Sequence, residues 1–320
     1  MLLQKLTSLN IDTFWFKDYL KNRTQSVILG KIESDKIGIN FGVPQGSILG
    51  PPMFLVQIND LIVVAIKCLL VKYADDAQFV HADTLENLPT LKTKVENTLA
   101  LAKNYFDRNG LLVNAKKTQI LIIGNRQILS QIPENFTIKY DGINIIPTKH
   151  AKNLGVHFDR YMSFETHIEE LSRKVMGTLI YLNRIKENFD KSTRLTIIES
   201  LVFSQLNYCF RIWGSANKTL LKRVQRLQNF AARIVDGRAR KYDHITPILK
   251  DLNWLNIEKS YKFKICIFLY DVVHGKYPSW FISLPTVREV IETRTRQSNH
   301  LHVGTRRVAR SVLLGTICPF

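Results

Sequence analysis

Two adjacent aspartates, Asp75 and Asp76, stand between two short apolar stretches at residues 69–71 and 79–80. Apolar arms around a tandem acidic pair predict a tight β-hairpin with carboxylates at its tip. Like charges held this close repel one another unless a cation lies between them. Magnesium prefers carboxylate and phosphate oxygens, so the pair is a candidate metal site that would also bind nucleotide phosphates. On these residues alone, a solvated turn without a ligand remains an alternative.

The composition limits the kind of partner. The chain has 320 residues, 45% of them hydrophobic, and a net charge of +18. Such an excess of positive charge makes a polyanion the first partner to consider, although a basic enzyme without one remains possible on charge alone. The four cysteines are widely spaced, without a C-x-x-C pair, which argues against a zinc site or a disulfide framework and favours an intracellular location, in the cytoplasm or nucleus. No apolar run is long enough to span a bilayer, so we expect no membrane partner.

The elements that must position the aspartates follow from the hydrophobic periodicity. Helices are predicted at residues 2–9, 14–20, 53–61 and 88–109, the last ended by Gly110. Strands are predicted at residues 26–30 and 36–41 with a polar turn at 33–35, and at residues 111–113, 119–123, 143–146 and 153–158. From residue 164 the period becomes helical, with apolar stripes through residues 168–179, 195–202 and 220–234.

Longer motifs surround the acidic pair. The sequence GVPQGSILGP at residues 42–51, followed by Phe54, precedes YADD at residues 73–76, and NLGV follows at residues 153–156 ahead of Asp159. In this order the motifs resemble the reverse transcriptases of jockey-like and related non-LTR retrotransposons, whose patterns are G-V-P-Q-G-S-x-L-G-P-x-x-F and Y/F-A-D-D. The resemblance covers nearly the whole chain.

The resemblance implies an α+β fold. Residues 1–160 would form part of the fingers and palm, an antiparallel sheet with helices, residues 161–241 a basic helical thumb, and residues 242–320 a helical C-terminal region. The implied activity is RNA-directed DNA polymerisation, with an RNA template, a DNA primer and deoxynucleoside triphosphates as substrates and two magnesium ions as cofactors. The oligomeric state is not indicated.

The resemblance also implies roles for single residues. Asp75 would be the main metal ligand and Asp76 its weaker neighbour. The residues near the nucleotide and the primer terminus would be Gln45, Gly46, Tyr73, Ala74 and Lys117, and the primer strand would be supported by Leu154 and Gly155. For Gly46 an ordinary turn glycine, and for Lys117 a solvated surface lysine, remain alternatives.

A basic face accompanies the last apolar stripe. Five cations fall outside that stripe: Lys218, Lys222, Arg223, Arg226 and Arg233. In the thumb that the resemblance implies, they would contact the phosphates of primer and template. A merely solvated helix face is the competing interpretation.

One family motif does not occur in these 320 residues. The related enzymes carry an earlier catalytic aspartate in a D-x-x-x-A-F-D pattern, just before the segment that matches residues 2–6. Asp12, Asp18 and Asp60 are poor replacements, because the first two lie in the helical start and the third in a predicted helix. We therefore expect this chain alone to be inactive or very weak as a polymerase. One alternative is a non-catalytic nucleic-acid-binding remnant of such an element. Another is a gene-model fragment with no stable fold, because the missing first palm strand would leave an open sheet edge.

Overall fold

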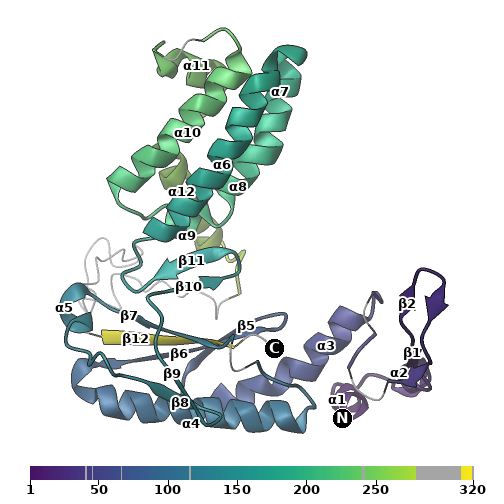
Figure 1. Ribbon diagram of the computed structural model, residues 1–320. Helices are drawn as coiled ribbons and strands as arrows, with labels where there is room; N and C mark the ends of the chain where they lie inside the picture. The colour runs from purple at the N-terminus through teal and green to yellow at the C-terminus, as the bar shows by residue number, and fades with distance from the viewer. Residues whose placement is uncertain are drawn as a thin grey trace. The chain divides into compact units, whose positions relative to one another are not determined.

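The computed structural model describes residues 1–39, 42–44, 46–65, 67–114, 117–239, 242–278 and 311–318, the last by backbone alone. The chain divides into two compact units (Figure 1). Unit 1 comprises Met1–Ala151 together with Arg310–Phe320, and unit 2 comprises Lys152–Ala309. Helices and small antiparallel sheets occur together, so the α+β prediction is confirmed at this level.

Unit 1 begins with two short helices and an exposed ribbon. Helices α1 (Leu2–Ser8) and α2 (Phe14–Leu20) lie where the apolar periodicity predicted them. In the ribbon, β1 (Thr24–Gln25) pairs with β4 (Ile37–Gly38), and β2 (Ile28–Leu29) pairs with β3 (Ile32–Glu33). The turn predicted at residues 33–35 is wrong.

The ribbon turns at Gly30 and Lys31 instead, because Leu29 pairs with Ile32. Gly30 has a φ of +64°, which glycine adopts without strain and which a two-residue hairpin loop requires. Polarity was therefore a poorer guide to this turn than the position of the glycine.

The main sheet of unit 1 has four antiparallel strands in the order β5-β6-β12-β7 (Figure 1). They are β5 (Leu69–Tyr73), β6 (Asp76–Thr84), β12 (Ser311–Cys318) and β7 (Gln119–Ile123). Helix α3 (Gly50–Ile58) begins with prolines in its first turn and continues as a 3-10 helix, η1 (Asn59–Ala65). A second 3-10 turn, η2 (Leu85–Asn87), leads from β6 into the long helix α4 (Leu88–Arg108).

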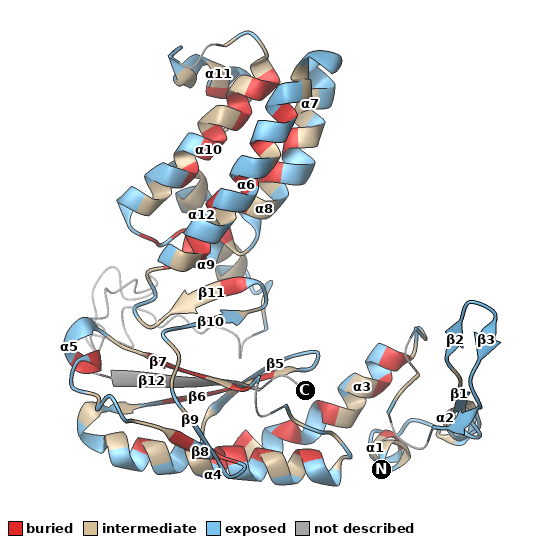
Figure 2. Ribbon diagram, in the orientation of Figure 1, coloured by how far each residue is buried: buried red, intermediate tan, exposed pale blue. Residues whose placement is uncertain are grey.

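The core of unit 1 lies between α4 and the sheet. Apolar residues recur every three or four positions along α4 and are buried: Leu91, Val95, Leu99, Ala102 and Phe106. Figure 2 shows buried and exposed stretches along this helix. They belong to one hydrophobic cluster with Phe79 of β6 and with Ile120 and Ile122 of β7. The long amphipathic helix predicted at residues 88–109 is thus confirmed.

Two expectations for the following residues differ from the structure. Residues 111–113 are not a strand: Leu111 and Val113 pack on the core, whereas Leu112 is 88% exposed and has no ladder partner. The single strand predicted at residues 143–146 is present as β9 (Ile143–Ile145), and its partner β8 (Ile138–Tyr140) was missed. A short helix, α5 (Arg126–Leu129), precedes them.

Strand β12 was not expected, because residues 242–320 were predicted to be helical. All eight of its residues pair with β6, and Leu313 to Ile317 also pair with β7. Helices α11 (Ile245–Asp251) and α12 (Ile257–Val273) do form in the earlier part of that region. The helical prediction therefore fails for residues 311–318.

Unit 2 starts with a hairpin. The strand predicted at residues 153–158 is in fact two strands, β10 (His150–Asn153) and β11 (Val156–Asp159), and the chain enters unit 2 within β10. Leu154 and Gly155 form the turn between them, with φ angles of +43° and +82°. Positive φ at both central residues is the signature of a type I′ hairpin turn.

The rest of unit 2 is helical. Its elements are α6 (Glu165–Ile185), η3 (Lys186–Asn188), α7 (Lys191–Ile198), the π-helical turn η4 (Glu199–Phe203), α8 (Ser204–Asn207), α9 (Phe210–Trp213) and α10 (Lys218–Asp236), followed by α11 and α12. The predicted stripes form the core around fully buried Trp213. Leu201 is the exception, because it lies in the π-turn, where the extra residue shifts the helix phase and leaves its side chain 49% exposed. No helix among the described residues is long and apolar enough to cross a membrane.

Candidate active site and nucleic-acid interface

The two aspartates lie at the tip of the β5–β6 hairpin, as the sequence predicted. Tyr73 pairs with Asp76, so Ala74 and Asp75 form a two-residue turn. Ala74 has a φ of +49°, a left-handed conformation that is uncommon for a residue with a Cβ. The hairpin therefore carries local backbone strain at the residue before the acidic pair.

The carboxylates at this tip repel one another. Burial, followed by the negative charge of Asp75, raises the pKa of Asp76 above its ordinary value. A raised carboxyl pKa means that the ionised pair is unfavourable unless a positive charge comes close. The tip is therefore a pair of like charges that a bound cation would stabilise.

The residues present fit a divalent metal only in part. Asp75 and Asp76 offer carboxylate oxygens from a single turn, which can occupy one side of a magnesium coordination sphere. Within the part of the chain that the structure describes, no group of three or more His, Cys, Asp or Glu side chains is placed to hold a metal ion. Any further ligands would have to come from bound phosphate, water or another segment.

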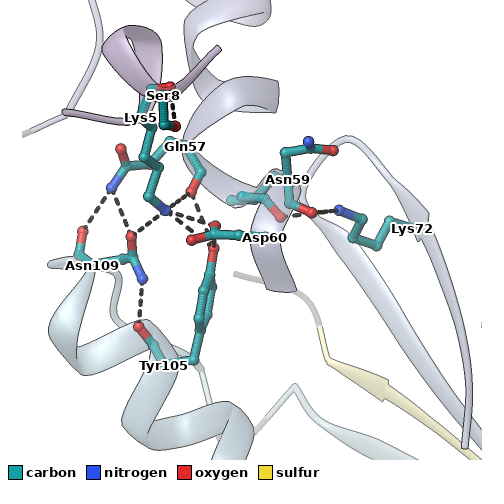
Figure 3. Close-up of polar contacts among 9 residues, drawn as sticks. Lys5, Ser8, Gln57, Asn59, Asp60, Lys72, Tyr105 and Asn109 are labelled. Carbon is teal, nitrogen blue, oxygen red and sulfur yellow. Dashed lines mark hydrogen bonds and ion pairs between the residues drawn. The ribbon is translucent and has the colours of Figure 1, made fainter. Parts of the chain in front are cut away.

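Asp60 is committed to a structural network and not to the hairpin (Figure 3). The ammonium group of Lys5 lies 2.7 Å from the Asp60 carboxylate, and the hydroxyl of Tyr105 donates to the same oxygen. Burial would raise the pKa of Asp60, but these hydrogen bonds and the charge of Lys5 outweigh it and lower the pKa. Lys5 also donates to the side chain of Asn109 at 2.7 Å. The network ties α1 to η1 and α4, which agrees with the expectation that Asp60 is a poor replacement for a missing catalytic acid.

Lys72 is a positioning residue that the sequence analysis missed. It lies in β5, and its ammonium group donates to the backbone carbonyls of Ile58 and Asn59 at 3.0 Å each (Figure 3). A cation that binds the last carbonyls of α3 stabilises the end of that helix and joins it to the hairpin. The sequence feature that could have revealed this role is a lysine inside an otherwise apolar strand.

The Gly-Pro loop before α3 is fixed by specific contacts. Gln45 lies outside the described residues. Gly46 has a φ of +79° and open space where a Cβ would lie, so backbone conformation alone demands glycine there. Ser47 shares a hydrogen bond with the hydroxyl of Tyr19, and a Cβ on Gly50 would lie 2.7 Å from the carbonyl oxygen of Pro44.

Lys117 is exposed at the start of the segment that leads into β7. Its backbone amide donates to the carbonyl of Asn114 at 2.9 Å, closing a turn. Among the described contacts, no hydrogen bond or ion pair joins Lys117 or Gly46 to the aspartates. The structure thus places the hairpin residues together, and it leaves the proposed nucleotide contacts of the other two untested.

In unit 2, the Leu154–Gly155 turn is held by Tyr208. The Tyr208 hydroxyl donates to the carbonyl of Leu154 at 2.6 Å, and its ring would lie 3.4 Å from a Cβ on Gly155. Trp213 in turn donates from its ring nitrogen to the carbonyl of Tyr208 at 2.8 Å. Trp213 is fully buried, so it packs in the core, and stacking on nucleic-acid bases is excluded for it in this conformation.

A cavity of about 680 Å³ opens beside this turn within unit 2. Its polar lining from β10, β11 and α6 includes Lys152, His157, Glu170, Arg173 and Lys174. His157 and Glu170 pair at 2.9 Å. Three cations remain against that one carboxylate, so the cavity suits an anion such as a phosphodiester group.

A second hollow, of about 480 Å³, lies between α6 and α10. Arg173 lines this hollow as well as the first, and Arg223 and Arg226 line it from α10. Arg223 also lies 3.5 Å from Glu169, while the buried hydroxyl of Ser172 has no hydrogen-bond partner. Arg173 therefore joins the two hollows. We call the cations that line them, Lys152, Arg173, Lys174, Arg223 and Arg226, the α6 basic track.

The five cations predicted on α10 do not share one environment. Arg223 and Arg226 are exposed and belong to the α6 basic track, whereas Lys218 and Lys222 are exposed outside it. Arg233 is half-buried and donates to the backbone carbonyls of Asn229 and Asp243. Arg233 therefore joins the last turns of α10 to the segment that follows the helix. The sequence analysis missed Lys152 of β10 and Arg173 and Lys174 of α6, which lie outside the α10 segment that it singled out.

Comparison with known proteins agrees with this geometry. Residues 1–158 match the family described as "Reverse transcriptase (RNA-dependent DNA polymerase)". The probable RNA-directed DNA polymerase from transposon BS of Drosophila melanogaster is 28% identical over 256 residues, covering 76% of this chain and 27% of that protein. The polymerase from transposon X-element of the same organism is 24% identical over 228 residues, covering 69% and 24% of the two chains.

A third relative is the RNA-directed DNA polymerase from mobile element jockey of Drosophila melanogaster, 24% identical over 246 residues, covering 74% of this chain and 26% of that protein. The chain thus spans about a quarter of the length of these curated relatives. The aligned stretches are longer than residues 1–158, so the similarity continues into the helical unit. Residues 1–158 therefore belong to the reverse transcriptase family, and the chain as a whole is related to the RNA-directed DNA polymerases of non-LTR retrotransposons.

Proposed function

We propose that this chain provides the hairpin side of a reverse transcriptase active site and a helical unit that holds primer and template. The observation that carries the proposal is the Asp75–Asp76 pair at a hairpin tip, inside a segment that matches the reverse transcriptase family. Reverse transcriptases generally use a divalent metal. Here Asp75 would be the main ligand, Asp76 the second, and the fit is to one side of a two-magnesium site.

Bound magnesium would supply charge neutralisation for nucleotide phosphates and activation of a primer hydroxyl. The protein's own residues would position the substrates around it. Tyr73, 65% exposed beside the turn, and strained Ala74 would form the floor under the primer terminus. Gln45 and Gly46 would border the incoming deoxynucleoside triphosphate, and exposed Lys117 would approach its phosphates.

Within unit 2, residues 161–241 would act as the thumb. Along the chain they lie between the fingers and palm region of residues 1–160 and a C-terminal region of residues 242–320, whose strand β12 joins the sheet of unit 1. The α6 basic track would contact the phosphates of an RNA template and a DNA primer, together with Lys218 and Lys222. The type I′ turn at Leu154 and Gly155, fixed by Tyr208, would support the primer strand. These substrates imply work inside the cell, in the cytoplasm or the nucleus.

A second function is favoured by one specific observation. The α6 basic track belongs entirely to unit 2 and includes neither aspartate, so binding does not require catalysis. The 320 residues contain no D-x-x-x-A-F-D pattern, and the described residues hold no third carboxylate beside the hairpin. A binding-only role, or extension that is very weak, is therefore our expectation for this chain by itself.

The deciding experiment measures magnesium-dependent nucleotide binding and primer extension for Asp75→Asn and for the matched control Asp107→Asn. Asp107 is an exposed acid in the same unit, paired with Lys103 at 2.8 Å on α4. Asp75→Asn should abolish magnesium-dependent binding and any extension, while folding stays intact or improves slightly because like-charge repulsion is relieved. The control should change neither. Unfolding of Asp75→Asn, or equal loss in both variants, would remove the catalytic assignment.

A further inference from the structure

The second hollow described above, which we call the α6–α10 hollow, differs in its cations from the cavity beside the β10–β11 turn. Helices α6 and α10 pack together within unit 2 (Figure 1). The cations of the α6–α10 hollow are all arginines, namely Arg173, Arg223 and Arg226, whereas two cations of the cavity are the lysines Lys152 and Lys174. A lysine ammonium acts as a point charge, but a guanidinium group presents a planar pair of N–H donors to one phosphate. The α6–α10 hollow therefore suits close, directional contact with a single phosphate group.

The charge of the α6–α10 hollow matches a phosphate with two negative charges. Among the described residues that line it, Glu169 is the only carboxylate, and it lies 3.5 Å from Arg223. The side chains of Arg173 and Arg226 form no ion pair or hydrogen bond within the described part of the chain. Three arginines against one carboxylate leave two positive charges. A phosphodiester within a strand carries one negative charge, whereas a terminal phosphate carries about −1.5 to −2 at pH 7, so the balance favours a terminal phosphate.

Ser172 supplies a hydrogen-bond donor to the same hollow. It is 5% exposed and lines the α6–α10 hollow, and its hydroxyl has no partner among the described contacts. A buried hydroxyl without a partner costs free energy, and an acceptor oxygen on a bound group would remove that cost. A terminal phosphate offers three free oxygens, one more than a phosphodiester, so it can bind two arginines and still accept from Ser172.

We propose that the α6–α10 hollow seats the terminal phosphate of a nucleic-acid strand, a phosphate monoester bound by Arg173, Arg226 and the hydroxyl of Ser172. The proposal deepens the proposed binding of primer and template and rests on it. Arg173 also lines the cavity beside the β10–β11 turn, so the two hollows form one continuous positive surface. Such a surface favours a polyanionic strand over an isolated phosphate or a phosphopeptide.

The first test compares single-stranded oligonucleotides that differ only in their ends. They carry a 5′-phosphate, a 3′-phosphate or hydroxyls at both ends, and they bind the full chain without magnesium, so that the acidic hairpin holds no metal. A terminal phosphate should tighten binding by about tenfold, because it adds charge-assisted hydrogen bonds, and the preferred end identifies the source of the phosphate. Inorganic phosphate should abolish this preference without displacing the strand that ends in hydroxyls.

The second test uses variants of the hollow. Ser172→Ala and Arg226→Gln should each reduce the preference for a terminal phosphate to less than about threefold. Lys191→Gln is the matched control, because Lys191 is an exposed cation of unit 2 that pairs with Asp251 and lines neither hollow, and it should keep the full preference. Ser172→Ala should fold at least as stably as the wild type, since it removes a buried hydroxyl without a partner.

Each contrary result has its own meaning. Equal binding of phosphate and hydroxyl ends would show that the hollow contacts only internal phosphates, and the proposal would fail while the proposed binding of primer and template stands. Binding of no strand at all would remove both. A preference that survives in Ser172→Ala and Arg226→Gln would place the terminal phosphate elsewhere and overturn the proposal. A phosphoserine peptide that binds in place of the strand end would make the hollow a phosphopeptide site instead.

Discussion

Unit 1 and unit 2 close their hydrophobic cores in different ways. In unit 2, helices that follow one another along the chain surround Trp213, so the core assembles from one continuous stretch. In unit 1, residues 311–318 complete a sheet whose other strands end at residue 123. Closing so long a loop costs entropy before the strand gains any contact, so unit 1 depends on a distant segment and unit 2 does not.

The largest expected effect is the loss of a core aromatic side chain from one unit at a time. Phe79 in unit 1 and Trp213 in unit 2 are both 0% exposed. Either substitution to alanine should cost about 3–5 kcal/mol, because it removes buried apolar surface and leaves a cavity. We expect Trp213→Ala to lower amide protection in unit 2 alone and Phe79→Ala to lower it in unit 1 alone. If both units lost protection together in either variant, they would fold as one cooperative body and the comparison would fail.

The next largest expected effect concerns the binding of nucleic acid, which we assign to unit 2. If unit 2 holds nucleic acid, alanine at Lys222, Arg223 and Arg226 should weaken primer–template binding for all sequences alike. The slope of log affinity against log salt should flatten by about 0.7–0.9 for each lost phosphate contact. Lys191→Ala is the matched control, since Lys191 is an exposed cation of unit 2 that pairs with Asp251 and lines neither hollow. An unchanged slope in the triple variant would mean that the basic face is only solvated.

Elements whose contacts are local in the sequence could be predicted, and elements whose partners are distant could not. Helices α4, α6 and α10 were predicted because their apolar residues recur at a helical period over many turns. The acidic hairpin was predicted because its apolar arms are adjacent in the sequence. Strand β12 was missed because nothing local specifies its partners. Residues 111–113 were misassigned because a short apolar run cannot show whether a ladder partner exists.

Single residues of the site were also missed where their partners lie far away in the sequence. Lys72 binds the end of α3, and Tyr208 binds the Leu154 carbonyl, across separations of 13 or more residues. The sequence identified the acidic pair because both residues are adjacent and of one chemical type. It did not identify the side chains that hold the hairpin and the turn in place, because each acts on a backbone group that carries no sequence signal.

A smaller effect concerns pH and the interior of unit 1. Burial, and then the charge of Lys94, lowers the pKa of His81, whose ring nitrogen Nε2 has no hydrogen-bond partner. The folded state therefore binds fewer protons at His81 than the unfolded state, so stability is lost as the pH falls below the ordinary histidine pKa.

The slope from this one group cannot exceed about 1.4 kcal/mol per pH unit. His81→Leu should flatten the pH dependence of unit 1 between about pH 6.5 and 5, as measured by denaturant unfolding with amide exchange. The pH dependence of unit 2 should persist, because burial followed by the charge of His157 lowers the pKa of its own His167. Equal flattening in both units would contradict their independence.

The smallest effect tests whether the turn in unit 2 is set by its backbone. Gly155 has a φ of +82° and Gly177 lies exposed within helix α6, so the same substitution should have opposite signs at the two sites. Alanine at Gly155 should destabilise unit 2 by roughly 1 kcal/mol, because a Cβ disfavours the left-handed conformation and meets the ring of Tyr208. Alanine at Gly177 should stabilise it by about 0.5–1 kcal/mol, because it reduces the entropy lost on forming the helix. Denaturant unfolding followed by tryptophan fluorescence measures both changes. If Gly155→Ala proved neutral, the turn would adapt to a side chain, and its proposed support of a primer strand would lose its structural basis.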